Sequence, residues 1–172
     1  ETPEAFATKI QAGKEVAVSE DFMVIARIES LIAGVGLEDA LSRAESYIEA
    51  GVDGVMIHSN LRDPQDLFAF VDAYNNLCDR MGRRPVLVSV PTTYNQHSDQ
   101  ELVDLGFNII IHANHLLRAS HRAMIAAAGS ILENDRSLES DEIISPVKEI
   151  FSAVGFDRIT ARDRAERAEL RL

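Results

Sequence analysis

The chain has 172 residues, of which 46% are hydrophobic and 26% charged, and this balance suits one folded domain with a real core. Its formal net charge of −11 argues against a nucleic-acid partner and against anionic lipid, so any anionic ligand needs a local positive pocket. The single cysteine, Cys78, excludes an internal disulfide, and the lack of a long apolar run or a signal peptide predicts a cytoplasmic protein without a membrane segment.

The first predicted element is a helix that begins at Pro3, with Thr2 as its N-cap, and ends near Gln11 before Gly13. The apolar run 22–26 follows, and its β-branched centre predicts an interior strand of a parallel sheet, with both faces buried. In an alternating fold a strand should precede the first helix, and the sequence has none. We therefore expect residues to be missing on the N-terminal side.

Strands and helices alternate through the rest of the chain. Buried strands are predicted over 52–57, 85–90 and 107–111, because each is a short apolar run that stops at polar residues. Helical spacing predicts helices over 37–50, from 64 onward with Asp63 as N-cap, and over 117–133 and 139–154, the last interrupted near Pro146. A short helix through Leu105 is predicted with Ser98 as its cap. The charged segment from Asp157 is interpreted as a solvated helix or a disordered end.

This alternation indicates an α/β fold with a parallel sheet, and four strands that all end in polar residues predict the C-terminal half of a (β/α)8 TIM-type barrel. A complete barrel needs about 250 residues. Residues 1–156 are interpreted as this partial barrel, equivalent to the last four strands with extra C-terminal helices, and residues 157–172 as a charged tail. A small doubly wound sheet is the alternative, and it is disfavoured because no glycine-rich phosphate-binding turn follows the first strand.

Polar side chains follow all four predicted strands, at the edge where α/β proteins place their chemistry. The first strand ends in Arg27 and Glu29, and the second in His58 and Ser59. The third and fourth strands are followed by Thr92, Thr93, Tyr94, Asn114 and His115, with Arg118 just inside the next helix. The pattern predicts one shared ligand site at this edge.

Arg27 and His58 are the strongest candidates for contact with an anion. The guanidinium of Arg27 is a fixed fork of donors that suits a phosphoryl or carboxylate group. His58 can donate to the same anion, or move a proton near neutral pH. Glu29 could accept from a ligand hydroxyl or water, or orient Arg27. The structural alternatives are an ion pair that closes the strand end and a core histidine bonded to a backbone carbonyl.

The remaining candidates are supporting residues. Ser59, Thr92 and Asn114 carry short polar groups that could orient a ligand, and His115 joins them at the fourth strand end. For Arg118 we favour a structural role, in which the arginine ties its helix to the barrel rim. No metal ligand is assigned, because the aspartates that suit Mg²⁺ do not follow these strands.

Five blocks of sequence, in order and at natural spacing, resemble the phosphoenolpyruvate mutase branch of the isocitrate lyase/phosphoenolpyruvate mutase superfamily. The blocks are FMVIARIESLIAGVGL (22–37), AGVDGVMIHS (50–59), VPTTY (90–94), ANHLLRAS (113–120) and SPVKEIF (145–151). The resemblance covers nearly the whole chain, and it is specific because the five blocks match together.

The resemblance implies a (β/α)8 barrel whose last helix is exchanged between subunits, in a homo-oligomer that is a dimer or a tetramer. It also implies Mg²⁺ and an α-keto acid or enol phosphate ligand. Arg27 and His58 match residues of the family that bind the phosphoryl group. The family's catalytic aspartate, its magnesium-binding acidic residues and its gating loop belong to the first half of the barrel, outside this sequence. The chain alone is therefore expected to be inactive.

The activity that the resemblance implies is the interconversion of phosphoenolpyruvate and phosphonopyruvate, which makes a phosphorus–carbon bond for phosphonate biosynthesis. The ANHLLRAS block favours a mutase over a phosphonopyruvate hydrolase, and the VPTTY block disfavours the carbon–carbon lyases of the superfamily. The hydrolase and lyase activities remain alternatives. A further alternative, of another class, is a non-catalytic half-barrel that binds a partner subunit or a phosphorylated metabolite.

Overall fold

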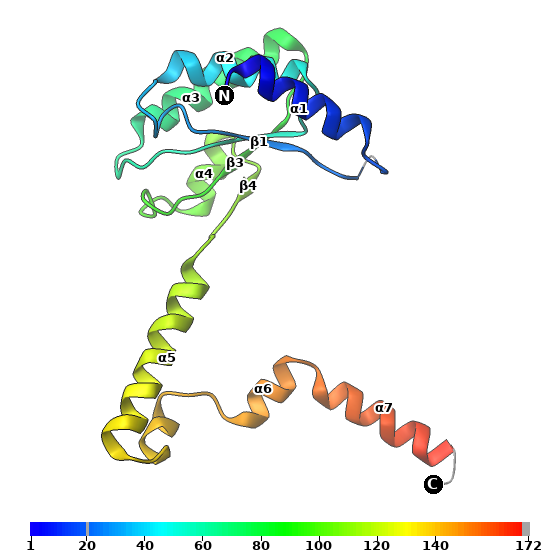
Figure 1. The fold of residues 1–172 in the computed structure, drawn as a ribbon, viewed down its shortest axis with the longest axis vertical. Coiled ribbons are helices and arrows are strands. Elements are labelled where there is room, and N and C mark those ends of the chain that lie inside the picture. Colours follow the sequence, from blue (N-terminus) through cyan, green and yellow to red (C-terminus); the bar gives the residue numbers. More distant parts are fainter. Residues whose placement is uncertain (20, 170–172) are drawn as a thin grey trace. The chain divides into compact units, whose positions relative to one another are not determined.

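The structure is a computed structural model, and it describes residues 1–19 and 21–169. The chain divides into two compact units, Glu1–Ala113 and Asn114–Leu172. Figure 1 labels most of the elements of both units. No helix in the described part of the chain combines the length and the apolar composition that a membrane span requires.

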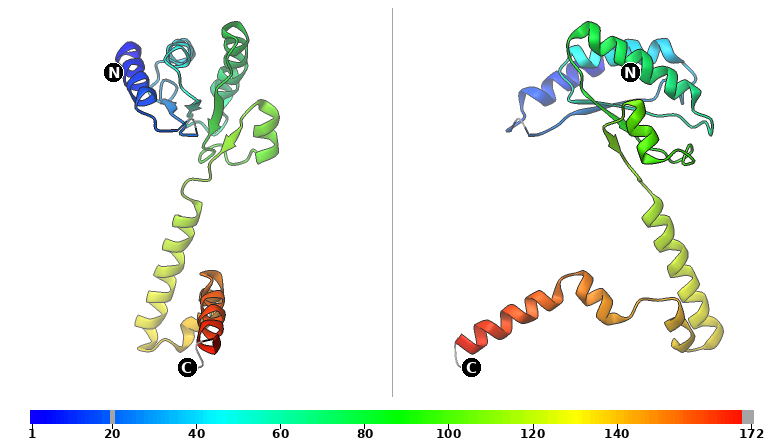
Figure 2. Two further views of the ribbon diagram at one scale, coloured as in Figure 1. Left: turned by 90° about the vertical axis from the view of Figure 1, so that its right-hand side faces the viewer. Right: turned by 180° about the vertical axis from the view of Figure 1, so that it is seen from behind.

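The first unit is an α/β structure with a four-stranded parallel sheet in the order β1-β2-β3-β4, which confirms the fold class at this level. The strands are β1 (Ile25–Ile28), β2 (Gly54–Ile57), β3 (Val86–Ser89) and β4 (Ile109–Ile110). The helices are α1 (Pro3–Glu15), α2 (Leu37–Glu49), α3 (Gln65–Met81) and α4 (Asp99–Leu105). Figures 1 and 2 show α1, α2 and α3 on one side of the sheet.

The core of the first unit lies between the sheet and these helices. β1 alternates between exposed and buried side chains, and Ala26 and Ile28 point into the core. The inner face of α3 is buried, and its buried side chains include Leu67, Phe70, Val71, Tyr74 and Leu77. Each large apolar side chain that is fully buried contributes roughly 1.5–3 kcal/mol, so this layer holds the sheet against the helices.

The prediction that the first strand is buried on both faces is wrong. β1 begins only at Ile25, and the side chains of Phe22, Met23 and Ile25 are 60%, 45% and 37% exposed. Figure 1 shows α1, α2 and α3 on one side of the sheet, and only alternate residues of β1 reach the core. An apolar run alone does not reveal which of its faces is covered.

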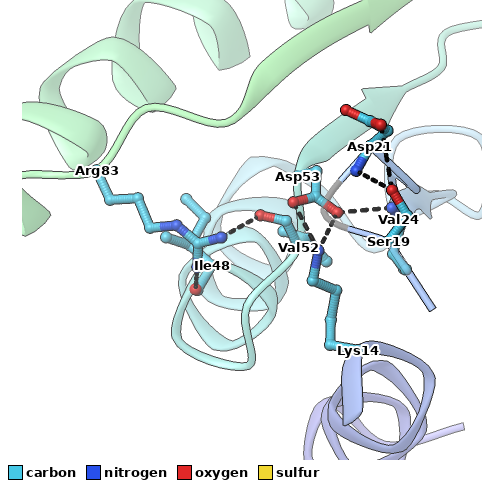
Figure 3. Close-up of polar contacts among 8 residues, drawn as sticks. All are labelled: Lys14, Ser19, Asp21, Val24, Ile48, Val52, Asp53 and Arg83. Atoms are coloured by element: carbon cyan, nitrogen blue, oxygen red, sulfur yellow. Dashed lines mark hydrogen bonds and ion pairs between the residues drawn. The ribbon is translucent and has the colours of Figure 1, made fainter. Parts of the chain in front are cut away.

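The N-terminal edge of the sheet is held by hydrogen bonds around Asp53 (Figure 3). Its two carboxylate oxygens accept from Lys14 Nζ at 2.8 and 2.7 Å, and Oδ2 also accepts from the Val24 N–H at 2.7 Å. The Asp53 carbonyl accepts from the Val86 N–H at 2.9 Å. Arg83 donates to two backbone carbonyls near the end of α2 and the start of β2, at 2.5 and 2.7 Å. These contacts join α1, α2, β1, β2 and β3 at one edge.

The predicted end of the first helix near Gln11 is wrong, since α1 continues through Gly13 and its C-cap is Val16. Lys14 lies in the last turn of α1, and its ammonium group is held by Asp53, 39 residues further along the chain. This long-range contact extends the helix beyond the glycine. The predicted start is confirmed, because the Thr2 side chain accepts from the Ala5 N–H and Pro3 is the first helical residue.

The starts of α3 and α4 differ in how well they were predicted. Pro64 occupies the N-cap of α3, so the helix begins one residue later than predicted, and Asp63 instead accepts from the Gln65 side chain at 2.9 Å. Ser98 caps α4 as predicted, and Glu101 completes a capping box. A short polar side chain therefore caps α4, whereas the N-cap of α3 is a proline.

β2 begins at Gly54, which pairs with Ile25 of β1 and Val86 of β3. A Cβ at this position would lie 2.7 Å from Val86 Cγ2 and 3.1 Å from Ile25 Cγ1. The missing side chain therefore permits the close approach of its two neighbours, as glycine does inside strands.

The second unit consists of α5 (His115–Asn134), the 3₁₀ helix η1 (Leu138–Glu142), α6 (Val147–Ala153) and α7 (Phe156–Glu169). The described residues of α5, α6 and α7 include no buried side chain. Residues 157–169 lie in α7, which agrees with the predicted solvated helix, and residues 170–172 of the predicted charged segment lie outside the described residues. The predicted boundary between a partial barrel (1–156) and a charged tail (157–172) stays a prediction.

Candidate active site

The C-terminal edge of β1 and β2 brings together Arg27, Glu29 and His58. Arg27 pairs with Met56 in the parallel register, so the two side chains point to the same face of the sheet. Arg27 Nη1 lies 3.9 Å from Met56 Sδ. Glu29 and His58 each follow two residues later, and the charges of both Arg27 and Glu29 act on the His58 ring. The predicted neighbours therefore meet at one strand edge.

Arg27 and Glu29 form an ion pair in which Arg27 Nε donates to Glu29 Oε1. Both side chains are 48% exposed, so the pair is open to solvent. Exposed ion pairs of this kind are worth about 0.2–1 kcal/mol, because water and salt screen them. An incoming anion could therefore replace Glu29 as the partner of Arg27 at little cost.

His58 is half-buried beside this pair. Burial, followed by the positive charge of Arg27, lowers the pKa of His58 below its usual range, and the Glu29 carboxylate opposes that shift. This shift favours the neutral form of the ring. Its Nδ1 is buried, and the described part of the chain offers it no hydrogen-bond partner. This is not the arrangement of a core histidine that is bonded through Nδ1 to a backbone carbonyl.

Ser59 helps to build this edge of the sheet. Its hydroxyl is fully buried, donates to Asp66 Oδ1 at 3.0 Å and accepts from the Leu61 N–H at 3.3 Å. Thr93 Oγ1 donates to the Ser59 carbonyl at 3.1 Å, which joins the β3–α4 loop to the β2–α3 loop. These bonds assign Ser59 to loop support, and its predicted contact with a ligand stays a prediction.

The end of β3 is closed by Tyr94, which is fully buried. Its Oη lies 3.0 Å from Ser89 Oγ, and burial raises the pKa of the phenol. Thr92 is half-buried in the same loop, and its N–H donates to the Val90 carbonyl at 2.8 Å. Tyr94 is therefore a core residue of the loop, whereas the role of Thr92 stays a prediction.

Three predicted supporting residues lie in the second unit. Asn114 is the N-cap of α5, His115 is the first residue of that helix, and the exposed Arg118 donates its N–H to the Asn114 carbonyl at 2.9 Å. The structure brings together the candidates of the first unit, Arg27, Glu29 and His58. Roles for Asn114, His115 and Arg118 at the same site remain predictions.

Sequence reasoning missed Met56 and a group of polar residues behind Arg27. A cavity of about 280 Å³ is lined by Arg27 and Glu29 and also by Ser30, Asp39 and Arg43. Met56 could have been found from strand alternation, because it lies two residues before His58. Ser30 and Asp39 gave no signal, because their contact depends on the path of the turn between β1 and α2.

The described side chains do not by themselves match the Mg²⁺ that the resemblance implies. Among residues 1–19 and 21–169, no group of three or more His, Cys, Asp or Glu side chains is arranged to hold a metal ion. The Glu29 carboxylate already forms an ion pair with Arg27. The described residues therefore do not form a complete magnesium site by themselves.

Comparison with known proteins gives one consistent family. A family model described as phosphoenolpyruvate phosphomutase matches residues 2–132. The phosphoenolpyruvate phosphomutase of Tetrahymena pyriformis is 37% identical over 159 residues, which cover 92% of this chain and 51% of the relative. The chain spans about half the length of the curated relatives it matches.

Two solved structures resemble this one equally well. A phosphoenolpyruvate phosphomutase from Streptomyces platensis subsp. rosaceus has a TM-score of 0.84 and 35% identity, over 95% of this chain and 55% of that protein. A phosphonopyruvate hydrolase in complex with oxalate and Mg²⁺ also has a TM-score of 0.84, with 34% identity over 98% of this chain and 56% of that protein. Overall similarity therefore does not separate these two activities.

Proposed function

Since the chain belongs to the phosphoenolpyruvate phosphomutase family, we propose that the complete protein that carries it interconverts phosphoenolpyruvate and phosphonopyruvate. The observation that carries the proposal is the meeting of Arg27 and His58 at one strand edge, beside a weak ion pair. This edge presents a half-exposed guanidinium to solvent in a chain whose net charge is −11.

In this proposal Arg27 and His58 hold the phosphoryl group while it moves. The bond from phosphorus to the enol oxygen breaks, a bond from phosphorus to the methylene carbon of the enol forms, and the enol oxygen becomes the ketone oxygen. A phosphoryl group in transit has a loose, metaphosphate-like character, and the protein acts by placing donors around its charged oxygens. Arg27 supplies a fixed cationic fork after release from Glu29, and the neutral His58 ring supplies one N–H donor.

The chain spans about half the length of its relatives, which supports a proposal for the rest of the site. We propose that this chain is the C-terminal half of a (β/α)8 barrel and that the other half supplies the catalytic aspartate and the Mg²⁺ ligands. The hydrolase structure with oxalate and Mg²⁺ supports a metal in the family. When bound, Mg²⁺ would neutralise charge on an enolate or carboxylate of the substrate. A cytoplasmic homo-oligomer and a place in phosphonate biosynthesis are parts of the same proposal.

A second activity is supported by the equal likeness to phosphonopyruvate hydrolase. In that reaction water takes the phosphoryl group from carbon, and the products are pyruvate and phosphate. The same Arg27 and His58 would hold the phosphoryl group, so the first unit is compatible with both reactions.

Phosphorus-31 NMR of the complete protein with phosphonopyruvate and Mg²⁺ separates the candidates. Phosphoenolpyruvate as the product supports the mutase, and inorganic phosphate supports the hydrolase. If neither forms at micromolar protein over hours, both enzyme proposals fail, and the non-catalytic half-barrel becomes the better account.

A further inference from the structure

The turn between β1 and α2 is fixed by a chain of hydrogen-bonded polar side chains that have no role in the proposed reaction itself. We propose that Ser30 and Asp39 are positioning residues, which together with Arg43 hold this turn and so keep Arg27 and Glu29 in place. The structural part of the inference stands by itself, and its kinetic consequence rests on the proposed function.

The chain of side chains begins at Ser30, which is 4% exposed and lies three residues after Arg27. Its hydroxyl donates to Asp39 Oδ2 at 2.5 Å, and Arg43 Nε donates to the same oxygen at 2.7 Å. Arg43 Nη1 donates to Tyr47 Oη at 3.3 Å. Three consecutive polar contacts thus link the end of β1 to the buried face of α2.

Asp39 occupies a position where an acidic residue normally serves the start of its own helix. The N-cap of α2 is Gly36, which offers no side chain for a capping box. Asp39 reaches back nine residues to Ser30 instead. Hydrogen bonds from Arg43 and then from Ser30 lower the pKa of Asp39, so it is ionised at neutral pH and accepts from both partners.

The backbone of the turn depends on the same serine. The Ser30 carbonyl accepts from the N–H groups of Val35 and Gly36 at 2.9 and 3.3 Å, and the Glu29 carbonyl accepts from the Ala33 N–H at 2.8 Å. Ser30 is therefore held through its carbonyl by the far side of the turn and through its hydroxyl by α2. Glu29, the partner of Arg27, directly precedes this doubly held residue.

Arg27 and Glu29 are exposed and bind each other weakly, so their own contacts do not define their positions. The Ser30–Asp39–Arg43 chain lines the same cavity of about 280 Å³ as Arg27 and Glu29. If the hydroxyl of Ser30 is removed, the turn loses its tie to α2, and Glu29 and Arg27 gain freedom. A misplacement of about 1 Å at a catalytic centre can cost about 100-fold in rate.

The kinetic test uses a double-mutant cycle in the complete protein, with phosphonopyruvate as substrate. Ser30→Ala is expected to lower kcat/KM by about 10- to 100-fold. In an Arg27→Ala background the same change is expected to have no further effect, because Ser30 acts through Arg27. Equal losses in both backgrounds would overturn the proposal, since they would mean that Ser30 acts independently of Arg27.

Matched controls separate positioning from general damage. Asp39→Asn keeps an oxygen acceptor for Ser30 and should lose less activity than Asp39→Ala. Ser42→Ala and Glu38→Gln change exposed residues of the same helix and should leave kcat/KM within twofold of the unchanged protein. If Ser42→Ala costs as much as Ser30→Ala, the positioning role is rejected.

A second readout needs no turnover. In protein with labelled arginine, the NMR signal of the Arg27 Nε–H group reports the contact with Glu29, and hydrogen exchange reports the Val35 and Gly36 amides. Ser30→Ala is expected to shift or broaden the Arg27 signal and to speed exchange of both amides. An unchanged Arg27 signal overturns the inference even where activity falls. If phosphonopyruvate is not turned over, the proposed function fails, and this readout alone decides the positioning role.

Discussion

Each of the two edges of the sheet carries an ion pair, but the two pairs differ in their exposure to solvent. At the N-terminal edge, Asp53 accepts from Lys14 and from the Val24 N–H, and the side chains of Asp53 and Lys14 are only 24% and 28% exposed (Figure 3). At the C-terminal edge, Arg27 and Glu29 are each 48% exposed. The Lys14–Asp53 pair is largely shielded from solvent, whereas the Arg27–Glu29 pair is exposed and can exchange partners.

The difference shows how to separate a structural ion pair from a candidate ligand site. The carboxylate of Asp53 accepts three hydrogen bonds from two protein donors, Lys14 Nζ in α1 and the Val24 N–H just before β1. The C-terminal edge keeps unused capacity, since the buried Nδ1 of His58 finds no partner among the described residues. Unmet hydrogen-bonding capacity, more than the mere presence of charge, marks the edge where a ligand can bind.

The largest effect should come from Arg27→Ala in the complete protein. Loss of the guanidinium removes a cationic donor from the phosphoryl group, and we expect a fall in kcat of about 100- to 1000-fold. The melting temperature should stay within about 2 °C, because an exposed pair contributes little to stability. Steady-state kinetics and thermal unfolding measure the two quantities.

The matched control for this change is Arg84→Ala. Arg84 is 50% exposed and paired with Asp79, so it resembles Arg27 in type, exposure and partner but lies before β3, away from the site. Its removal should leave turnover unchanged. Equal losses in the two variants would break the distinction between the edges.

Asp53→Ala should have its main effect on stability. The change leaves the part-buried Lys14 ammonium and the Val24 N–H without their acceptor, and such unpaired groups cost about 1–3 kcal/mol. Urea unfolding measures this loss. Asp79→Ala, at a carboxylate whose side chain is 72% exposed, should change stability by no more than about 0.5 kcal/mol. A neutral result for Asp53→Ala would show that the N-terminal edge is not held by this contact.

Acid should weaken the N-terminal edge in a defined pH range. Burial alone would raise the pKa of Asp53, but hydrogen bonds from Lys14 and the Val24 N–H and the charge of Lys14 lower it overall. Because the folded-state pKa lies below the unfolded value of about 3.9, Asp53 stabilises the fold above that pH, and the contribution is lost as pH falls through the folded pKa. Urea unfolding between pH 3 and pH 7 should show a shallower decline for Asp53→Asn. Identical slopes would contradict the assignment.

The smallest expected effect is a change in the pKa of His58, followed by NMR titration of its ring. Burial and then the charge of Arg27 lower this pKa, whereas Glu29 raises it. Arg27→Met should therefore raise the pKa of His58, and Glu29→Gln should lower it further. Shifts of the same sign in both variants would mean that the three side chains do not share one edge.

The order of elements in the first unit was predictable because apolar runs and helical spacing alternate along the chain. The strand limits were not, since residues such as Phe22 are apolar without being covered by a helix. The end of α1 also escaped prediction. Gly13 is a normal stop signal, but the bond between Lys14 and Asp53 spans 39 residues and overrides it.

The candidate site was predictable as far as polar residues follow the apolar runs that form strands. Arg27 and His58 follow apolar runs, and parallel strands place such residues at one edge. The supporting contacts were not readable from sequence. Ser59 bonds to Asp66 and Ser30 to Asp39, and neither pairing follows from spacing, because each depends on the course of an irregular loop.

Gly54 has a consequence for protein engineering. The space that it leaves open is filled by the side chains of both neighbouring strands, with 2.7 Å from a would-be Cβ to Val86 Cγ2. In a randomised library selected only for expression, position 54 should return glycine almost alone, whereas exposed Met23 should accept a wide range of residues. Deep mutational scanning would thus recover the spacing of the strands without reference to any substrate.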